Sequence, residues 1–480
     1  MLQDKDTIIL REISNFFTEG EKAINTIFGI TRSLLLSRNR ILPKEANNQK
    51  YRNHDKLLLL LLFPLFKIKD AYHYDGSALD RIVSCGKDVF YRMLNDENMD
   101  WRSLCYCITK KLIEQARQKG ENTTVGLRCL IIDDTDLPKT GRCMELIGRV
   151  YSHVTHTSLL AFKGLFMAYH DGKSLYALDF SLHGEKGKNE KKPYGLTASQ
   201  SKNRYTKKRA KGSYGYARKE EYFTTKIASM ISMIRICITN GVRFDYLLVD
   251  SWFTCYQLVA FIKSRRIGCH LLGMIKMGKT NYCYNGKDLS SKQIVDALRR
   301  CKKTKRSKAT GFYYGHADVL LKGIKVRLFF SKATRRGRWH GMLSTNLELT
   351  FEQAYKIYAT RWTIEIYFKE SKQYLGLGKC ESQDFDAQIA HTSLCMMQYN
   401  ILSLAKRFDK YETLGVLFRE TIHNTLEITL ADRIWMIITS LVARLVVILD
   451  VDQEMLMENL IVDNQELTEL INLKPYFKAD

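Results

Sequence analysis

The sequence predicts an α/β protein whose mixed sheet is flanked by helices. Residues 127–136, "LRCLIIDDTD", are typical of a short apolar strand that ends in carboxylates. Residues 162–182 contain two apolar runs joined by Asp171 and Gly172, which is a strong hairpin signal. Beyond residue 219, expected helices alternate with expected strands. Hairpin strands followed by such alternation indicate a sheet with both parallel and antiparallel pairs and helices on its faces.

The other elements follow from hydrophobic periodicity and turn residues. Residues 1–125 are expected to be helical, and either a DNA-binding helix-turn-helix or a packed helical bundle fits them. Residues 277–347 contain turn signals, basic runs and strand-like segments, which indicate a β-rich insertion. The α/β sequence then comprises 126–276 and 348–408, and 409–480 is expected to be a helical C-terminal region with a role in assembly as one option. The elements expected within the α/β part are a helix at 219–238, a strand at 246–250, a helix through 253–266, a strand at 269–275 and a helix over 351–374.

Charge favours a polyanionic partner. The 480 residues carry 75 Lys and Arg against 51 Asp and Glu, a formal charge of +24. Such an excess is most often associated with nucleic acid. The longest apolar run, "LLLLLLFPLF" at 57–66, is about half the length of a membrane span, and the run at 436–449 is broken by Arg444. We therefore expect no membrane partner and a cytoplasmic protein.

Two basic segments are candidates for contacts with nucleic-acid phosphates. Residues 186–219 hold twelve Lys and Arg and one acid, Glu190, with tyrosines between them. Residues 299–308 hold seven basic residues in ten. Phosphate neutralisation by such segments would make binding steeply dependent on salt. A solvated loop with no partner is the alternative for the first segment.

Three acids are candidates for metal binding. Asp134, beside Asp133, ends the first apolar strand, Asp250 ends another, and Glu365 lies on an expected helix. Ligands gather at the carboxyl ends of strands in open α/β sheets. Clustered carboxylates repel one another unless a cation such as Mg²⁺ or Mn²⁺ compensates, and two such ions suit phosphodiester chemistry. Taken singly, each Asp could instead cap a turn, and Glu365 could simply pair with Arg361.

The segment "YATRWTIEIYFKESK", residues 358–372, carries an unusual polar group. On one continuous helix, at about 100° per residue, its four polar side chains fall within roughly 60° of one another. They flank an apolar stripe and therefore lie at the edge of the buried face. The polar residues are Tyr358, Arg361, Glu365 and Lys372, and the stripe is Ile357, Ile364, Phe368 and Leu375.

This spacing, Y-(2)-R-(3)-E-(6)-K, resembles the signature of bacterial DDE transposases of the insertion-sequence-four group. "IIDDTDLPKTGR" at 131–142 and "LLVDSWF" at 247–253 resemble the two aspartate motifs of that group. The resemblance covers residues 127–400 or so. It implies a ribonuclease-H-like catalytic domain with a β-rich insertion between the second Asp and the Glu.

The resemblance also implies roles for individual residues. Asp134, Asp250 and Glu365 would be the catalytic, metal-binding triad, with Asp134 preferred over Asp133 because the acid of the group directly precedes Thr, here Thr135. Two Mg²⁺ or Mn²⁺ ions would be the cofactors. The phosphate-binding residues would be Tyr358, Arg361 and Lys372, and Asp133, Asp136 and Lys139 are supporting or alternative residues.

The implied activity is cleavage at insertion-sequence ends and strand transfer into target DNA. The implied partner is double-stranded DNA, both terminal inverted repeats and target, bound by a homodimer or higher assembly at the bacterial nucleoid. A metal-dependent nuclease without strand transfer and a transposon-derived DNA-binding protein without activity are alternatives.

Two further patterns are given weaker interpretations. "GMIKMGKT" at 273–280 has the spacing of a phosphate-binding loop around Lys279, but no helix is expected after it, so no nucleotide cofactor is predicted. Trp252 and Trp362 are interpreted as core aromatic residues.

Overall fold

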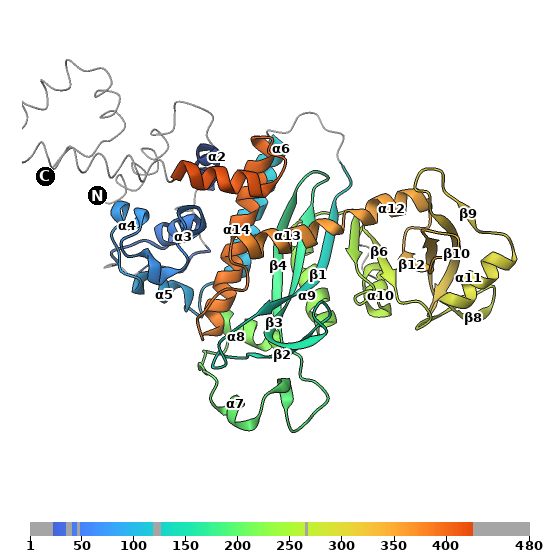
Figure 1. Ribbon diagram of the computed structural model, residues 1–480, viewed down its shortest axis with the longest axis horizontal. Helices are drawn as coiled ribbons and strands as arrows, with labels where there is room; N and C mark the ends of the chain where they lie inside the picture. Colours follow the sequence, from blue (N-terminus) through green and yellow to red (C-terminus); the bar gives the residue numbers. More distant parts are fainter. Residues whose placement is uncertain (1–22, 35–40, 46–48, 119–125, 265–266, 426–480) are drawn as a thin grey trace, which may run out of the picture. The chain divides into compact units, whose positions relative to one another are not determined.

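The structure is a computed structural model that describes residues 23–34, 41–45, 49–118, 126–264 and 267–425 (Figure 1). The chain divides into two compact units, one of residues 1–94 with 401–480 and one of residues 95–400.

The described part of the first unit is helical, as the sequence predicts. The Leu-rich run forms a helix that ends at Leu62, directly before a 3₁₀ helix with Pro64 in its first turn, and most of the side chains of the Leu-rich helix are buried. Phe63, Tyr74 and Phe90 pack against one another with ring centroids 4.7–5.6 Å apart. The helix expected at 436–449 lies outside the described residues. The elements are α2 (Ala23–Ser33), α3 (Asn53–Leu62), η2 (Phe63–Phe66), η3 (Ala71–Tyr74), α4 (Ala78–Ile82) and α5 (Asp88–Leu94), with helical residues again at 414–425.

The second unit contains a mixed sheet, which confirms the predicted fold class. In the described residues the sheet has twelve strands in the order β2-β3-β1-β5-β6-β12-β11-β10-β7-β8, with β4 on β3 and β9 on β10. Only β1–β5 and β5–β6 are parallel pairs. The strands are β1 (Cys129–Pro138), β2 (Gly148–Ser152), β3 (Thr157–His170), β4 (Leu175–His183), β5 (Tyr246–Val249), β6 (His270–Ile275), β7 (Asn281–Tyr284), β8 (Lys287–Ser290), β9 (Lys305–Arg306), β10 (Tyr313–Leu321), β11 (Ile324–Lys332) and β12 (His340–Ser344).

Strands β4, β3, β1, β5 and β6 are successive neighbours in the sheet. The first three are antiparallel neighbours and the last two run parallel to β1. The predicted hairpin joins β3 to β4: Asp171 Oδ1 accepts hydrogen bonds from the backbone N–H groups of Lys173 and Ser174, and Gly172 has φ +98°. A positive φ at this position favours glycine.

Residues 277–347 fold into strands β7–β12 and helix α11 (Ser291–Arg300). The last of these strands, β12, returns to pair with β6, so this segment extends the same sheet. Asn285 and Gly286 both have positive φ in the tight turn between β7 and β8. Strand β7 begins two residues after Lys279, so the helix that a phosphate-binding loop requires is absent after this loop in the described structure.

Helices pack on β1 and on the nearby strands β3 and β4. Helix α13 packs on β1 and β4, and α9 packs on β3 and β4. No helix in the described ranges is long and apolar enough to span a bilayer. The helices of this unit are α6 (Trp101–Gln118), η4 (Pro193–Gly195), α7 (Ala198–Lys202), α8 (Tyr214–Tyr222), α9 (Lys226–Thr239), α10 (Tyr256–Ser264), α12 (Phe351–Ala359), α13 (Trp362–Tyr374) and α14 (Phe385–Phe408), the last of which continues into the first unit.

Candidate active site

Two neighbouring parallel strands bring Asp133 and Asp250 together. Ile132 of β1 pairs with Val249 of β5, and the two aspartates follow directly after that pair. Partners on adjacent strands lie about 4.8 Å apart and point to the same face of the sheet. The two backbone positions are therefore neighbours at the end of the buried part of both strands. Asp250 Oδ1 also accepts hydrogen bonds, at 2.8 and 3.1 Å, from two backbone N–H groups of the turn that follows.

Arg361 links Asp133 to Glu365. Its Nη1 lies 2.5 Å from Asp133 Oδ2, and its Nη2 donates to Glu365 Oε1 at 2.7 Å. Burial raises the pKa of Asp133 to about 7; Arg361 opposes this rise and Asp250 adds to it. One planar guanidinium thus holds two acids that lie far apart in the sequence.

Asp134 faces the other side of β1. Successive side chains alternate across a strand, so Asp134 points away from Asp133. Its carboxylate is paired with Lys226 in the first turn of α9, and the same ammonium lies 4.0 Å from the centre of the Trp252 ring. The structure therefore does not bring Asp134 together with Asp250 and Glu365; Asp133 takes the position that the sequence assigned to Asp134.

The expected helix over 351–374 is interrupted, which corrects the prediction of one continuous helix. Helix α12 ends at Ala359 and α13 begins at Trp362. The backbone N–H groups of Thr360 and Arg361 donate to carbonyls three residues earlier, so the junction is a tight 3₁₀-type turn. The polar side chains still gather near β1, and the four predicted stripe residues Ile357, Ile364, Phe368 and Leu375 are buried.

Tyr358 and Lys372 both make hydrogen bonds to the strands that carry the acids. Tyr358 Oη donates to the carbonyl of Val249 at 3.1 Å, and burial raises the pKa of this tyrosine. Lys372 Nζ donates to Thr135 Oγ1 at 2.7 Å, and burial lowers the pKa of this lysine. Since Thr135 is two residues from Asp133, both lie on the face of β1 that α13 covers.

Asp136 and Lys139 connect β1 to its surroundings. Asp136 pairs with Lys163 of the adjacent strand β3. Lys163 is 5% exposed. Lys139 Nζ donates to the carbonyls of Gly378 and Cys380 at 2.7 and 2.9 Å. Both contacts hold β1 in place, one against β3 and the other against the loop before α14.

The sequence interpretation of the two tryptophans is wrong. Trp252 is 42% exposed and Trp362 is 61% exposed, so neither is a core residue. Lys226 is a further residue of this region that the sequence did not reveal. It pairs with Asp134 and lies over the Trp252 ring. No spacing rule connects a lysine in α9 with an acid in β1, because the contact forms only when the sheet is assembled.

The carboxylates supply the oxygen ligands that Mg²⁺ and Mn²⁺ prefer. Among the residues that the structure describes, no three His, Cys, Asp or Glu side chains are grouped so as to hold an ion as they stand. Arg361 occupies the space between Asp133 and Glu365. The residue types fit a divalent cation, and the guanidinium already supplies the positive charge that such a group of acids needs.

The basic segment 186–219 separates into paired and exposed cations. Arg209 is fully buried and contacts Glu145, Asp384 and Asp386 at 2.7–3.2 Å. Lys207, Arg218 and Lys219 also make ion pairs within the unit. These four cations hold the segment in place. The exposed lysines are Lys186, Lys188, Lys191, Lys192, Lys202, Lys208 and Lys211.

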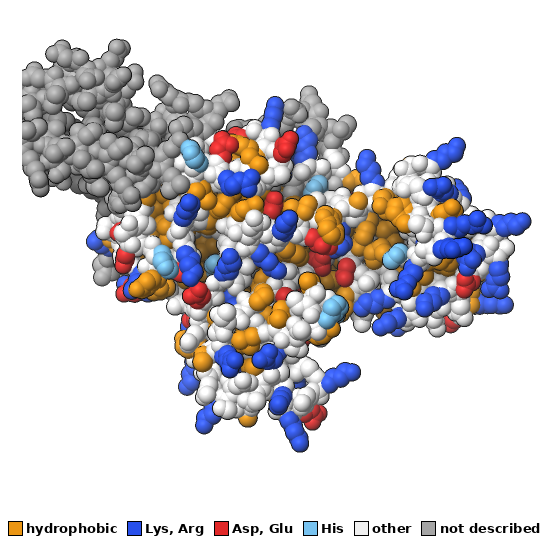
Figure 2. Space-filling model, in the orientation of Figure 1, with side chains coloured by type: hydrophobic (Ala, Val, Ile, Leu, Met, Phe, Trp, Pro, Cys, Tyr) orange, Lys and Arg blue, Asp and Glu red, His pale blue; other side chains and the backbone are white. Residues whose placement is uncertain are grey.

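All seven basic residues of 299–308 are exposed. Figure 2 shows Lys and Arg side chains gathered over the part of the molecule that contains strands β8–β10 and helix α11. This surface offers charge to a polyanion without first breaking buried ion pairs.

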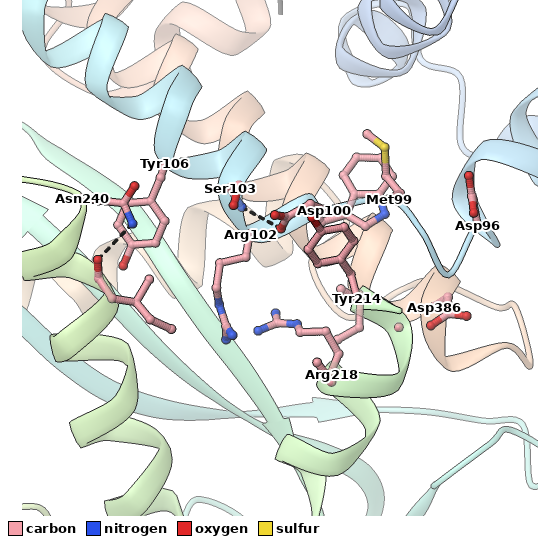
Figure 3. A pocket seen from close by; sticks show the side chains of 15 residues that line it. Asp96, Met99, Asp100, Arg102, Ser103, Tyr106, Tyr214, Arg218, Asn240 and Asp386 are labelled. Carbon is pink, nitrogen blue, oxygen red and sulfur yellow. Dashed lines mark hydrogen bonds between the residues drawn. The ribbon is translucent and has the colours of Figure 1, made fainter. Parts of the chain in front are cut away.

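A cavity of about 260 Å³ lies elsewhere in the same unit, between the start of α6 and α8 (Figure 3). Arg102 and Arg218 extend into it, and both are paired with Glu221. None of the predicted site residues lines this cavity. We therefore interpret these arginines as part of the packing between the helices and β4.

An α/β sheet that presents acids at the ends of adjacent parallel strands, in a strongly basic chain, is characteristic of enzymes that act on nucleic-acid phosphodiesters. Residues 78–271 match the family described as DDE superfamily endonuclease, and residues 230–401 match the family described as transposase DDE domain. These matches to DDE superfamily endonuclease and transposase domains indicate an enzyme that cleaves nucleic acid and transfers strands.

Two solved structures are similar to this chain. One is a cryo-EM structure of a piggyBac transposase synaptic complex with hairpin DNA, with 14% identity and a TM-score of 0.41 over 86% of this chain and 79% of that chain. The other is the NurA nuclease from Sulfolobus solfataricus, with 10% identity and a TM-score of 0.23 over 56% of this chain and 84% of that chain. No curated protein matches the sequence.

Proposed function

We propose that this protein is a cut-and-paste DNA transposase of the insertion-sequence-four group, with Asp133, Asp250 and Glu365 as its metal-binding acids. The observation that carries the proposal is the adjacency of Asp133 and Asp250 after the Ile132–Val249 pair. The contact of Arg361 with both Asp133 and Glu365 supports the third position. This assignment replaces Asp134 with Asp133 and keeps the other two acids that the sequence predicted.

Two Mg²⁺ or Mn²⁺ ions held by these acids would supply an activated nucleophile and stabilise the leaving oxygen. The protein contributes the ligands and their spacing through two rigid strands and one helix. Burial of Asp133 beside α13 limits the access of water to that carboxylate, whose side chain is 15% exposed.

Tyr358, Arg361 and Lys372 would bind phosphates near the scissile bond. In the protein alone each of them contacts an internal group: the Val249 carbonyl, the acids and Thr135, respectively. Arg suits two-pronged contacts with phosphate oxygens, Lys acts as a point charge and Tyr supplies a hydroxyl donor. Binding of DNA would therefore exchange internal hydrogen bonds for contacts with the backbone.

The partner would be double-stranded DNA, first the terminal inverted repeats and then the target. The exposed lysines of 186–211 and the basic residues of 299–308 support this role because they are available to neutralise phosphates. We propose that a homodimer or higher assembly holds both ends of the element, in the bacterial cytoplasm at the nucleoid.

Cleavage of a duplex that carries the terminal repeat, with Mg²⁺, tests the assignment. Asp133→Asn, Asp250→Asn and Glu365→Gln should each lower the cleavage rate by about a thousandfold or more, as expected for residues that act as one unit. Asp134→Asn is the matched control. It makes the same chemical change at the next residue of β1, whose side chain lies on the opposite face of the strand. It should cost less than about tenfold. The reverse order of effects at positions 133 and 134 would overturn the assignment.

Strand transfer separates a transposase from a nuclease. When a supercoiled target plasmid is added to the reaction, the cleaved end should become covalently joined to it. Cleavage without joined products, under conditions where the complex is stable, would favour the metal-dependent nuclease.

A further inference from the structure

Arg361 lies where a metal ion would be expected. Its two terminal nitrogens each contact one acid, at 2.5 Å to Asp133 and 2.7 Å to Glu365. The Arg361 and Asp133 side chains are each 15% exposed, and that of Glu365 is 36% exposed. A guanidinium cannot lose its proton in a protein, so it is a permanent positive charge between the acids.

Besides the two acids, Arg361 contacts the Tyr358 ring, whose centre lies 5.9 Å from the guanidinium carbon. It precedes the first residue of α13, at the positive end of a thirteen-residue helix. A cation at this end of a helix is repelled by the helix dipole, whereas the C-terminal end of α12, two residues earlier, attracts it. The two acids are the oppositely charged side chains that pair with Arg361 and hold it in this position.

Arg361 is the residue that directly precedes the first residue of α13. Arg361 is outside the regular part of both helices. Rotation about its side-chain bonds, without unwinding of α13, is enough to take the guanidinium away from Asp133. Glu365, in contrast, is fixed to the first turn of α13.

We infer that Arg361 is an exchangeable internal cation, which a divalent metal ion displaces from Asp133 and Glu365 and which then binds a DNA phosphate. This inference rests on the proposed function, since it takes the metal-binding acids from it. In the protein alone, Arg361 offsets the repulsion between carboxylates. Once a divalent cation has taken over that role, the guanidinium is released toward the substrate.

Competition of this kind predicts that Arg361 weakens metal binding in the absence of DNA. The test is Mn²⁺ titration of the full chain, followed by electron paramagnetic resonance of free Mn²⁺. Arg361→Gln should bind Mn²⁺ about tenfold more tightly than the wild type, because a charge-assisted hydrogen bond is worth about a factor of ten. Arg361→Lys should lie between the two, since it keeps the charge but loses the two-pronged geometry.

Lys369→Gln is the matched control, because Lys369 is an exposed cation one turn after Glu365 on α13. It removes the same charge from the same helix and should change Mn²⁺ affinity by less than about twofold. Unchanged or weaker Mn²⁺ binding by a folded Arg361→Gln protein would overturn the inference. Asp133→Asn should weaken Mn²⁺ binding; if it does not, the proposed function fails independently of Arg361.

A second readout uses DNA. If DNA draws Arg361 away from the acids, a duplex carrying the terminal repeat should tighten Mn²⁺ binding, and Mn²⁺ should tighten DNA binding by the same factor. In the Arg361→Gln protein, the factor by which DNA and Mn²⁺ tighten each other's binding should be several-fold smaller. An equal factor in both proteins would contradict the exchange of Arg361 between acid and phosphate.

Discussion

At the scale of single residues, the alternation of side chains along β1 decides the chemistry of the site. Asp133 and Asp134 are chemically identical neighbours, yet one contacts Arg361 and the other contacts Lys226. Sequence spacing could not choose between them, because both faces of the strand are covered. The pairing of Ile132 with Val249 makes the choice, since it aligns Asp133 with Asp250.

A buried histidine gives a test of stability against pH. His183 is 3% exposed, its Nε2 lies 2.7 Å from Ser181 Oγ, and burial lowers its pKa to about 4. Because the folded-state pKa is below the unfolded value of about 6.5, the unfolded chain binds a proton first as pH falls. The contribution of the neutral ring is therefore complete above pH 6.5 and is lost progressively toward pH 4.

Relative to His183→Gln, the wild type should lose about 2 kcal/mol of unfolding free energy between pH 7 and pH 4.5. Urea unfolding of both proteins at the two pH values measures this difference, and the titration of acids cancels between them. Parallel pH profiles would show that the ring is not held in its neutral form.

At the scale of elements, local sequence signals predicted the strands and turns well and the helix junction poorly. The β3–β4 and β7–β8 turns carry Asp-Gly and Asn-Gly, whose backbone preferences act locally. The break between α12 and α13 contains neither Gly nor Pro, so no stop signal marks it. Packing of both helices against the sheet, rather than local preference, sets this junction.

The edge of β4 is closed by a side chain. Asn400 of α14 accepts from the backbone N–H of Ala177 at 2.7 Å and donates to its carbonyl at 2.8 Å. It also donates to Thr109 Oγ1 of α6 at 2.9 Å and is fully buried. One amide thus joins two helices to an edge strand that would otherwise present unpaired backbone groups.

Asn400→Ala should lower the free energy of unfolding by about 3 kcal/mol, because it leaves both backbone groups of Ala177 buried without these partners. Thr109→Val is the control of similar shape; it removes only the contacts of the hydroxyl and should cost about 1 kcal/mol. Denaturant unfolding measures both. Equal costs would mean that Asn400 contributes volume rather than hydrogen bonds.

At the scale of the whole molecule, what the sequence could not predict is contact between distant segments. The return of β12 to β6 makes one sheet of segments that the sequence presented as a domain and an insertion. Likewise, the basic content of 186–219 did not reveal that Arg209 is buried against Glu145 and Asp384. Periodicity and charge counts describe neighbours along the chain, whereas these contacts depend on the assembled fold.

The proposed function requires that Asp133, Asp250 and Glu365 meet in space. The most direct measurement is anomalous X-ray scattering from crystals of the full chain grown with Mn²⁺. We expect anomalous peaks beside Asp133, Asp250 and Glu365, on the α13 side of β1, with the Arg361 guanidinium moved away from Asp133. A peak beside Asp134 on the α9 side, with Arg361 still between Asp133 and Glu365, would contradict this expectation.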